Sequence, residues 1–253
     1  MAGFINGKTN YKEWRDHTKD TRAHLARVSL IEGGITTPSD EYRLVGAIRV
    51  SEMSGKLEGY YSVSTSVLMN PNCQVRAQIP GSICEKCYAA SVASRYSQLT
   101  QTLETNYQIL NGFLISEEAW ASLQFPTTNG DARIESFGDV ATVVCARNYL
   151  RIIRSHPHLT FGVWTKNVSI WNFALEFDGG KPSNMKYIVS SFRVNEPEQL
   201  DEETLKYADH RFTVYTKEYA VENGICINCG GKKCATCRNC YGDGPFDINE
   251  LLK

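Results

Sequence analysis

Cysteine is concentrated near the C-terminal end of this chain, and this concentration limits what the chain can fold into more than any other feature. Five of the nine cysteines lie in the segment ICINCGGKKCATCRNCY, residues 225–241. They are Cys226, Cys229, Cys234, Cys237 and Cys240. Five ordinary buried thiols at this density would be exceptional, so the segment predicts a metal centre or a redox site.

The rest of the sequence indicates a reducing compartment, in which clustered thiols favour metal binding over disulfides. The N-terminal stretch MAGFINGKTN lacks the apolar core of a signal peptide, and no apolar run approaches membrane-spanning length. Hydrophobic residues make up 42% and charged residues 22%, which is typical of a globular protein rather than a disordered one. We therefore expect a cytoplasmic protein that does not bind membranes.

Two metal centres fit the C-terminal spacing, which is C-x2-C-x4-C-x2-C-x2-C. Four of the five thiols match a tetrahedral zinc site, because two C-x2-C pairs place four sulfurs around one ion. Alternatively, Cys234, Cys237 and Cys240 have the spacing with which bacterial ferredoxins hold three corners of an iron–sulfur cubane. Cys226 or Cys229 would then supply the fourth ligand. The sequence leaves open which of the five cysteines bind.

A second group of cysteines follows a strand-like run and opens a predicted helix. Cys73, Cys84 and Cys87 have the spacing C-x10-C-x2-C. Three thiolates can hold an iron–sulfur cluster and leave one iron without a protein ligand, which is what catalysis at a metal needs. The alternative is a structural zinc site completed by a thiol from elsewhere. Together, the two groups favour one or two 4Fe–4S clusters, with zinc as the alternative cofactor.

The segments between the two cysteine groups alternate between strand-like and helix-like patterns. We expect strands at 133–139, 159–166, 185–192 and 211–217, with helical segments at 140–156, 167–177 and 196–208. Upstream we expect a loop at 36–42, two short β-rich runs within 42–66, a loop at 69–72, and helices over 87–121 broken around Gly112. Cys145 lies in one of the predicted helices, where a buried structural thiol is expected.

This alternation is typical of βαβ units and a parallel sheet. We predict an α/β fold in which residues 1–220 form a (β/α) barrel-like or partial barrel domain with parallel strands. Residues 221–253 are predicted to be a cysteine-rich metal-binding segment packed on the same domain.

Several motifs resemble those of a family from phages and mobile elements, the gene-product-88-like proteins. They are SEMSGKLEGYYSVSTSVLMNPNC, ICEKCYAA, SFGD, WTKN and KCATCRNCY, and the resemblance extends from about Leu44 to Tyr241. It implies a phage-type protein in the cytoplasm of a host cell, with host or phage proteins as candidate partners. The family name implies no activity.

More distantly, the layout is similar to that of the radical S-adenosylmethionine superfamily, whose members use a full or partial (β/α) barrel. Their three cluster ligands follow the first strand, usually as C-x3-C-x2-C. The resemblance implies that Cys73, Cys84 and Cys87 hold the cluster, and that Gly138 and Asp139 contact the amino group of S-adenosylmethionine. It also implies an auxiliary cluster on the C-terminal cysteines. In this chain, ten residues separate the first two ligands.

The resulting expectation is an iron–sulfur protein of phage or mobile-element type that acts as a redox or radical S-adenosylmethionine-like enzyme. The sequence identifies neither a catalytic side chain nor a substrate. The alternative is a zinc-stabilised module without catalysis, in which Lys232, Lys233 and Arg238 face a protein or nucleic-acid partner. A formal net charge of −1 gives no overall basic field, so nucleic acid is the less favoured partner.

Overall fold

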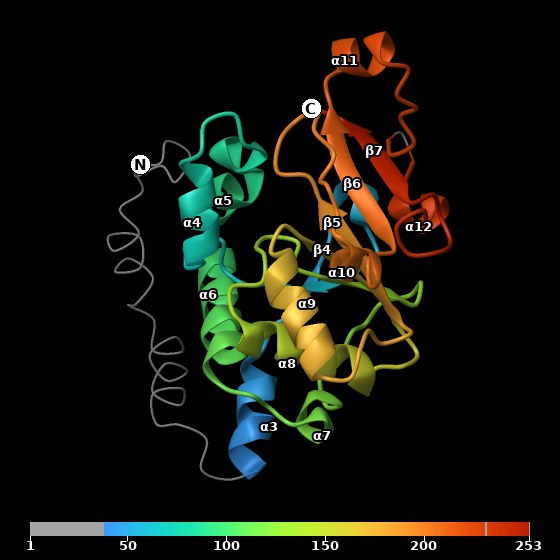
Figure 1. Cartoon of the computed structure of the whole chain (residues 1–253). Helices are drawn as coiled ribbons and strands as arrows, with labels where there is room; N and C mark the ends of the chain where they lie inside the picture. The colour runs from blue at the N-terminus through green and yellow to red at the C-terminus, as the bar shows by residue number, and fades with distance from the viewer. Residues whose placement is uncertain (1–37, 231, 253) are drawn as a thin grey trace.

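The computed structural model describes residues 38–230 and 232–252, which are built around a seven-stranded sheet (Figure 1). The strands lie side by side in their order along the chain, and only β1 and β2 are antiparallel. The strands are β1 (Ser51–Glu52), β2 (Tyr61–Val63), β3 (Asp131–Ile134), β4 (Thr160–Thr165), β5 (Met185–Ser190), β6 (His210–Tyr215) and β7 (Asp247–Leu251). The predicted α/β fold with parallel strands is confirmed, but the sheet is open and does not close into a barrel.

Helices connect the parallel strands, and none of those in the described ranges is long and apolar enough to cross a membrane. The α-helices are α3 (Pro38–Ala47), α4 (Pro71–Ala77), α5 (Tyr88–Ala93), α6 (Ser97–Gly112), α7 (Glu117–Trp120), α8 (Val143–Ser155), α9 (Val168–Phe177), α10 (Glu202–Leu205), α11 (Lys217–Glu222) and α12 (Cys234–Cys237). Two short 3-10 helices are η2 (Gly55–Leu57) and η3 (Ile83–Lys86).

The two faces of the sheet have different surroundings. Since parallel crossovers are right-handed and each new strand adds at the same edge, the connecting helices gather on one face. On that face Ile134, Val163 and Val189 pack with residues of α6, α8 and α9 in the main hydrophobic core. Side chains alternate along a strand, so their neighbours Arg133 and Trp164 point to the other face, where they line a cavity.

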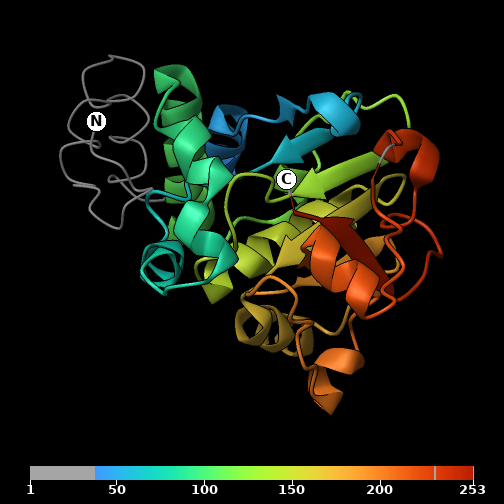
Figure 2. The same ribbon diagram turned by 90° about the horizontal axis from the view of Figure 1, so that it is seen from above.

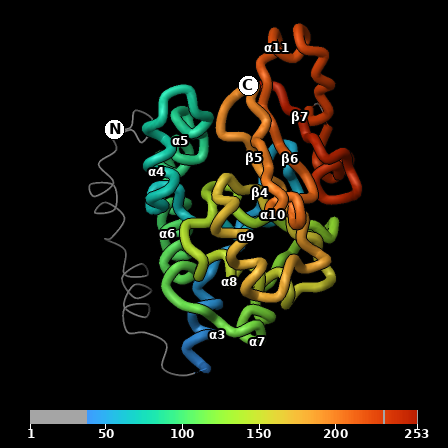
Figure 3. Tube along the Cα trace, viewed as in Figure 1, coloured from blue at the N-terminus to red at the C-terminus, as the bar shows by residue number. Residues whose placement is uncertain are grey.

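The cysteine-rich segment runs between the two edges of the sheet, β1–β2 and β7. After α11 the chain runs beside β7 and enters it only after α12 (Figure 3), and α12 contacts η2 next to the β1–β2 pair. Cys229 forms a β-bridge with Glu250 of β7, whereas Lys233 pairs with Glu58 beside η2 at 2.6 Å. A direct ion pair between Lys56 of η2 and Glu250 also joins the two ends. Side chains, rather than a strand ladder, therefore link the edges of the open sheet.

Several observed helices and strands differ from those that the sequence predicts. The final strand β7 was not predicted, because DINEL has neither a strong apolar alternation nor a β-branched run. Helix α3 occupies part of an expected loop and of an expected β-rich run. Helix α4 begins within the expected Pro/Asn loop, where Asn70 caps it by accepting a hydrogen bond from the Asn72 backbone N–H at 3.0 Å. Helix α10 is much shorter than predicted, since it begins only after its N-cap Asp201.

Candidate metal centres

A cavity of about 960 Å³ lies on the face of the sheet opposite α8 and α9, and both cysteine groups contribute to its wall. Seven of the eight predicted ligands line it: Cys73, Cys84, Cys87, Cys229, Cys234, Cys237 and Cys240. The eighth, Cys226, is exposed and lies outside the wall. The structure therefore brings together residues that are more than 130 positions apart in the chain, and it separates Cys226 from the others.

The first cysteine group follows β2 and stands beside the carboxyl ends of the parallel strands. Cys73 lies in α4, Cys84 in η3, and Cys87 is the N-cap residue of α5. Ser82 fixes the start of η3, because its hydroxyl accepts a hydrogen bond from the Glu85 backbone N–H at 3.1 Å. Two short helices with capped N-termini therefore hold Cys73 and Cys84, although ten residues separate these two ligands in the sequence.

The electrostatics of the first group show that its three thiols are mutual neighbours. Burial raises the pKa of the Cys73 thiol well above its usual range, and Asp139 and the other two thiols raise it further. Burial also raises the pKa of Cys84. The nearby Lys166 lowers this pKa, and Cys87 raises it. Thiols in such a place bind a proton or a cation, so the donor set suits a metal centre.

The second group consists of four thiols on the opposite wall. Burial, with Cys229 and Cys234 as close neighbours, raises the pKa of the Cys240 thiol to about 12. Burial also raises the pKa of Cys229 and of Cys234, while the ammonium group of Lys56 lowers both. Cys237 contributes to each of these three shifts. Four neighbouring thiols correspond in number to the ligand set of a zinc site or of a cubane cluster.

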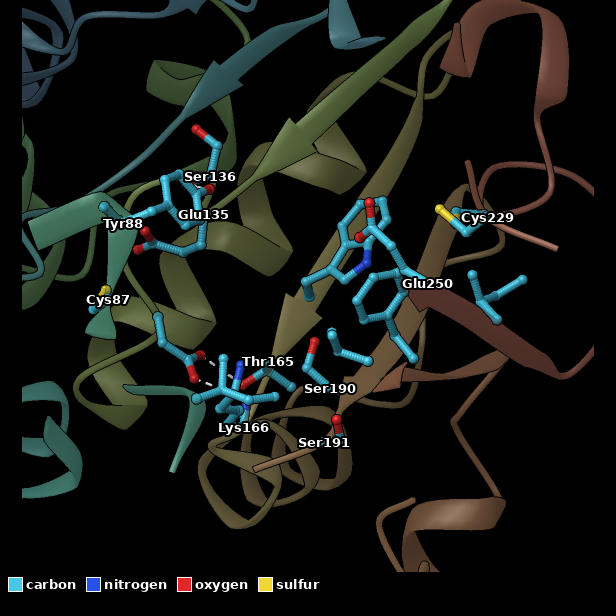
Figure 4. A pocket seen from close by; sticks show the side chains of 18 of the residues that line it. Cys87, Tyr88, Glu135, Ser136, Thr165, Lys166, Ser190, Ser191, Cys229 and Glu250 are labelled. Atoms are coloured by element: carbon cyan, nitrogen blue, oxygen red, sulfur yellow. Dashed lines mark hydrogen bonds between the residues drawn. The ribbon is translucent and has the colours of Figure 1, made fainter. Parts of the chain in front are cut away.

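The two groups face the cavity from different sides. Figure 4 shows Cys87 with Tyr88 and Glu135 on one side and Cys229 with Glu250 on the other. Seen from above, the red segment that holds α12 likewise lies far from the teal α4 and α5 (Figure 2). In the ranges that the structure describes, no three His, Cys, Asp or Glu side chains already converge closely enough to hold a metal ion. The type and number of donors, rather than a finished coordination geometry, support a metal here.

The carboxylate of Asp139 lies in the cavity wall and is already occupied. It accepts hydrogen bonds from the Val140 backbone N–H (2.8 Å), from the Thr165 hydroxyl (2.6 Å) and from the Lys166 backbone N–H (2.8 Å). The guanidinium of Arg76 is a fourth partner at 3.5 Å. Asp139 thus ties the end of β4 and helix α4 to the loop after β3. The cofactor contact predicted for it stays a prediction.

The second residue predicted to bind the cofactor, Gly138, is closely packed against protein atoms. A Cβ atom there would lie 2.8 Å from both the Glu135 carboxylate and the Thr65 backbone carbonyl. We expect Gly138→Ala to lower the free energy of unfolding by about 1–3 kcal/mol, because the neighbouring backbone must shift. Urea denaturation would measure this.

The control for this change is Gly46→Ala. Gly46 lies within α3, and among the described residues no atom outside its own helix lies within 4 Å of its would-be Cβ, so alanine there should leave stability equal or slightly higher. Equal stability of Gly138→Ala and the native chain would show that the loop after β3 is not packed as described.

A buried carboxylate, which the sequence does not predict, lies beside the first group. Glu135 follows β3 with a positive φ of 57°, which is uncommon for a residue with a side chain. Its carboxylate accepts hydrogen bonds from the Thr65 backbone N–H (3.0 Å), the Thr65 hydroxyl and the Tyr149 hydroxyl (2.6 Å). Burial nevertheless raises the pKa of Glu135 to about 7. Only the ESFGD stretch marks this residue in the sequence, and nothing in it indicates burial.

Comparison with protein families gives a match over most of the chain. The family model described as Gene product 88 matches residues 57–249, which is most of the chain. No curated protein and no solved structure matches. The matched range includes both groups of cysteines and all strands except β1 and the last two residues of β7.

Proposed function

The chain belongs to the gene product 88 family, and we propose that it is an iron–sulfur redox enzyme with two cluster sites that face one substrate cavity. The observation that carries this proposal is the placement of three thiols on one wall of the cavity and four on another. Cys73, Cys84 and Cys87 would hold the first cluster. The second would be held by the four thiols listed above for the opposite wall.

The number of thiols in each group supports different roles for the two sites. A cubane cluster needs four ligands, so four cysteines complete one and three leave an iron with an open position. Structural zinc sites are closed by four protein ligands, and catalytic sites keep one position open. An open position that faces a cavity of about 960 Å³ favours chemistry at the first site. The second site is suited to electron transfer or to holding the cysteine-rich segment in place.

Basic side chains near each group would offset the negative charge of a bound cluster. Lys166 and Arg76 lie beside the first group and lower the pKa of Cys84. Lys56 lies beside the second group and lowers the pKa of Cys234. When bound, such clusters supply one-electron transfer, with a potential set partly by net charge and solvent exposure. These three cations would therefore help to set both cluster binding and redox potential.

S-adenosylmethionine is the candidate ligand for the open position of the first cluster, by similarity of layout with the radical enzymes that use it. Recognition of its amino group by Asp139 receives no support from the geometry, because four donors already surround that carboxylate. Equilibrium dialysis of labelled S-adenosylmethionine against the iron-loaded protein would test this part separately.

The test of the proposed function is iron, acid-labile sulfide and zinc per chain, measured on protein purified without oxygen. We expect about eight irons, four for each cubane. Cys84→Ala and Cys237→Ala should each reduce this to about half, because each removes a ligand of a different cluster. Cys226→Ala and Cys145→Ala should retain the full content, since one thiol is exposed outside the cavity and the other is buried in α8.

Two results would contradict the proposal. Zinc without iron would make both cysteine groups structural, as in a binding module without catalysis. Full iron content in Cys84→Ala and Cys237→Ala alike would remove the assignment of these ligands.

A further inference from the structure

Three neighbouring side chains on the sheet side of the cavity form a cluster that carries a positive charge. The guanidinium of Arg133 lies over the indole ring of Trp164, 4.2 Å from its centre. The ring of Tyr241 lies 5.6 Å from the same indole. We propose that this cluster binds the carboxylate of a small organic acid with an apolar body. The inference rests on the proposed function in taking that acid as the substrate.

Polar atoms of this cluster lack the partners that buried polar atoms normally have. Neither Arg133 Nε nor the Tyr241 hydroxyl has a hydrogen-bond partner among the described residues, although both atoms are buried. The buried hydroxyl of Ser191 is a third such atom. All three residues line the cavity. Such atoms call for a polar ligand or water.

The charge of Arg133 is also unmatched within the described ranges, where it makes no ion pair. Of the six other basic residues that line the cavity, three have acidic partners: Lys56 with Glu250, Arg76 with Asp139, and Arg238 with Asp131. A half-buried guanidinium held on an indole ring, without a carboxylate partner, is preorganised for an anionic ligand.

The shape and surroundings of the cluster favour a carboxylate over a phosphate. A guanidinium presents two N–H groups side by side, which match the two oxygens of a carboxylate. Apolar side chains of β6 and β7 also line the cavity, namely Phe212, Val214 and Ile248. They would contact the body of the acid. Phosphate sites usually combine several cations or backbone N–H groups, and this cluster offers one cation.

Arg133 has a second candidate role, because it lies near the second cysteine group. It lowers the pKa of the Cys234 and Cys240 thiols. A guanidinium that served only as counter-ion to a cluster would affect iron content rather than the binding of acids. The two roles are therefore separated by measuring both quantities on the same variant.

The experiment follows the midpoint of thermal unfolding of the anaerobically purified, full-length protein as phenylacetate, phenylacetamide or phenylphosphonate is added. A ligand that binds the folded state raises this midpoint with concentration. We expect phenylacetate to raise it, phenylacetamide to have no effect, and phenylphosphonate to be weaker than phenylacetate. Arg133→Met should need at least about tenfold more phenylacetate for the same rise, because a charge-assisted pair is lost. Its iron content should be that of the native chain.

Lys186→Met is the matched control. Lys186 lies in the same row of the sheet as Arg133, two strands away, but it pairs with Asp243 and does not line the cavity. It should respond to phenylacetate as the native chain does. The proposal is overturned if Arg133→Met and the native chain respond equally, if the amide is as effective as the acid, or if phenylphosphonate is the stronger ligand. Because iron is measured in parallel, loss of the clusters would be recognised as failure of the proposed function instead.

Discussion

Replacing Arg238 with methionine is expected to lower the free energy of unfolding by about 3 kcal/mol or more at pH 8, because it leaves a buried carboxylate without its partner. The Asp131 side chain is fully buried, and a nitrogen of the Arg238 guanidinium lies 2.8 Å from one of its oxygens. The Tyr60 hydroxyl donates a further hydrogen bond at 3.2 Å. Burial already raises the pKa of Asp131 against the effect of Arg238. The loss should therefore be smaller at pH 5, where the carboxyl group is more easily protonated.

The geometry predicts an asymmetry between the two partners and supplies a matched control. Asp131→Asn should cost less than Arg238→Met, because the arginine side chain is 44% exposed and can turn to water. Lys233→Met removes another cation of the same segment, whose partner Glu58 is 62% exposed. That change should cost far less than Arg238→Met, because both members of the pair are exposed to solvent. Urea denaturation at both pH values measures all three. Equal losses for Arg238→Met and Lys233→Met would mean that the segment is not anchored at β3.

The part of the fold that follows from local pattern was predictable from the sequence. The segments that became β4, β5 and α9 have strong apolar periodicity, and their predicted and observed bounds agree closely. β7 has no such pattern, and its parallel pairing with β6 depends on a long crossover through the cysteine-rich segment. Whether the sheet closes depends on contacts between residues far apart in sequence. The contact between Lys56 and Glu250, 194 positions apart, is of this kind.

The candidate site divides in the same way. Cysteine spacing identified seven of the residues that line the cavity, because C-x2-C pairs are a local signal. Spacing could not distinguish Cys226 from the others, because it lies as close to Cys229 in sequence as Cys234 does to Cys237. In the fold Cys226 is exposed, whereas Cys229 forms a β-bridge with Glu250 and lines the cavity. The role proposed for Arg133 could not be predicted either, since it depends on Trp164 in the neighbouring strand.

Glu135→Gln is expected to abolish one pH-dependent part of the stability. In the folded chain the pKa of Glu135 is raised to about 7, mainly by burial, from its ordinary value of 4.5. Between these values the folded state holds a proton that the unfolded state has lost, so the free energy of unfolding falls as the pH rises. The difference of about 2.5 pKa units corresponds to about 3 kcal/mol lost between pH 4.5 and pH 8. Glutamine carries no titrating proton, so this loss should be absent.

The readout is the change of stability with pH rather than its value at one pH. Glutamine also replaces one carboxylate oxygen with an NH2 group, which faces either the Thr65 backbone N–H or the hydroxyls of Thr65 and Tyr149. The accepted hydrogen bonds that are lost in this way lower the stability equally at all pH values. Urea denaturation of the native chain and of Glu135→Gln from pH 5 to pH 8.5 separates the two effects. Glu176→Gln, on the exposed side of α9, should follow the native curve. Parallel curves for Glu135→Gln and the native chain would show that this carboxylate is ionised across the whole range, and that its three donors outweigh its burial.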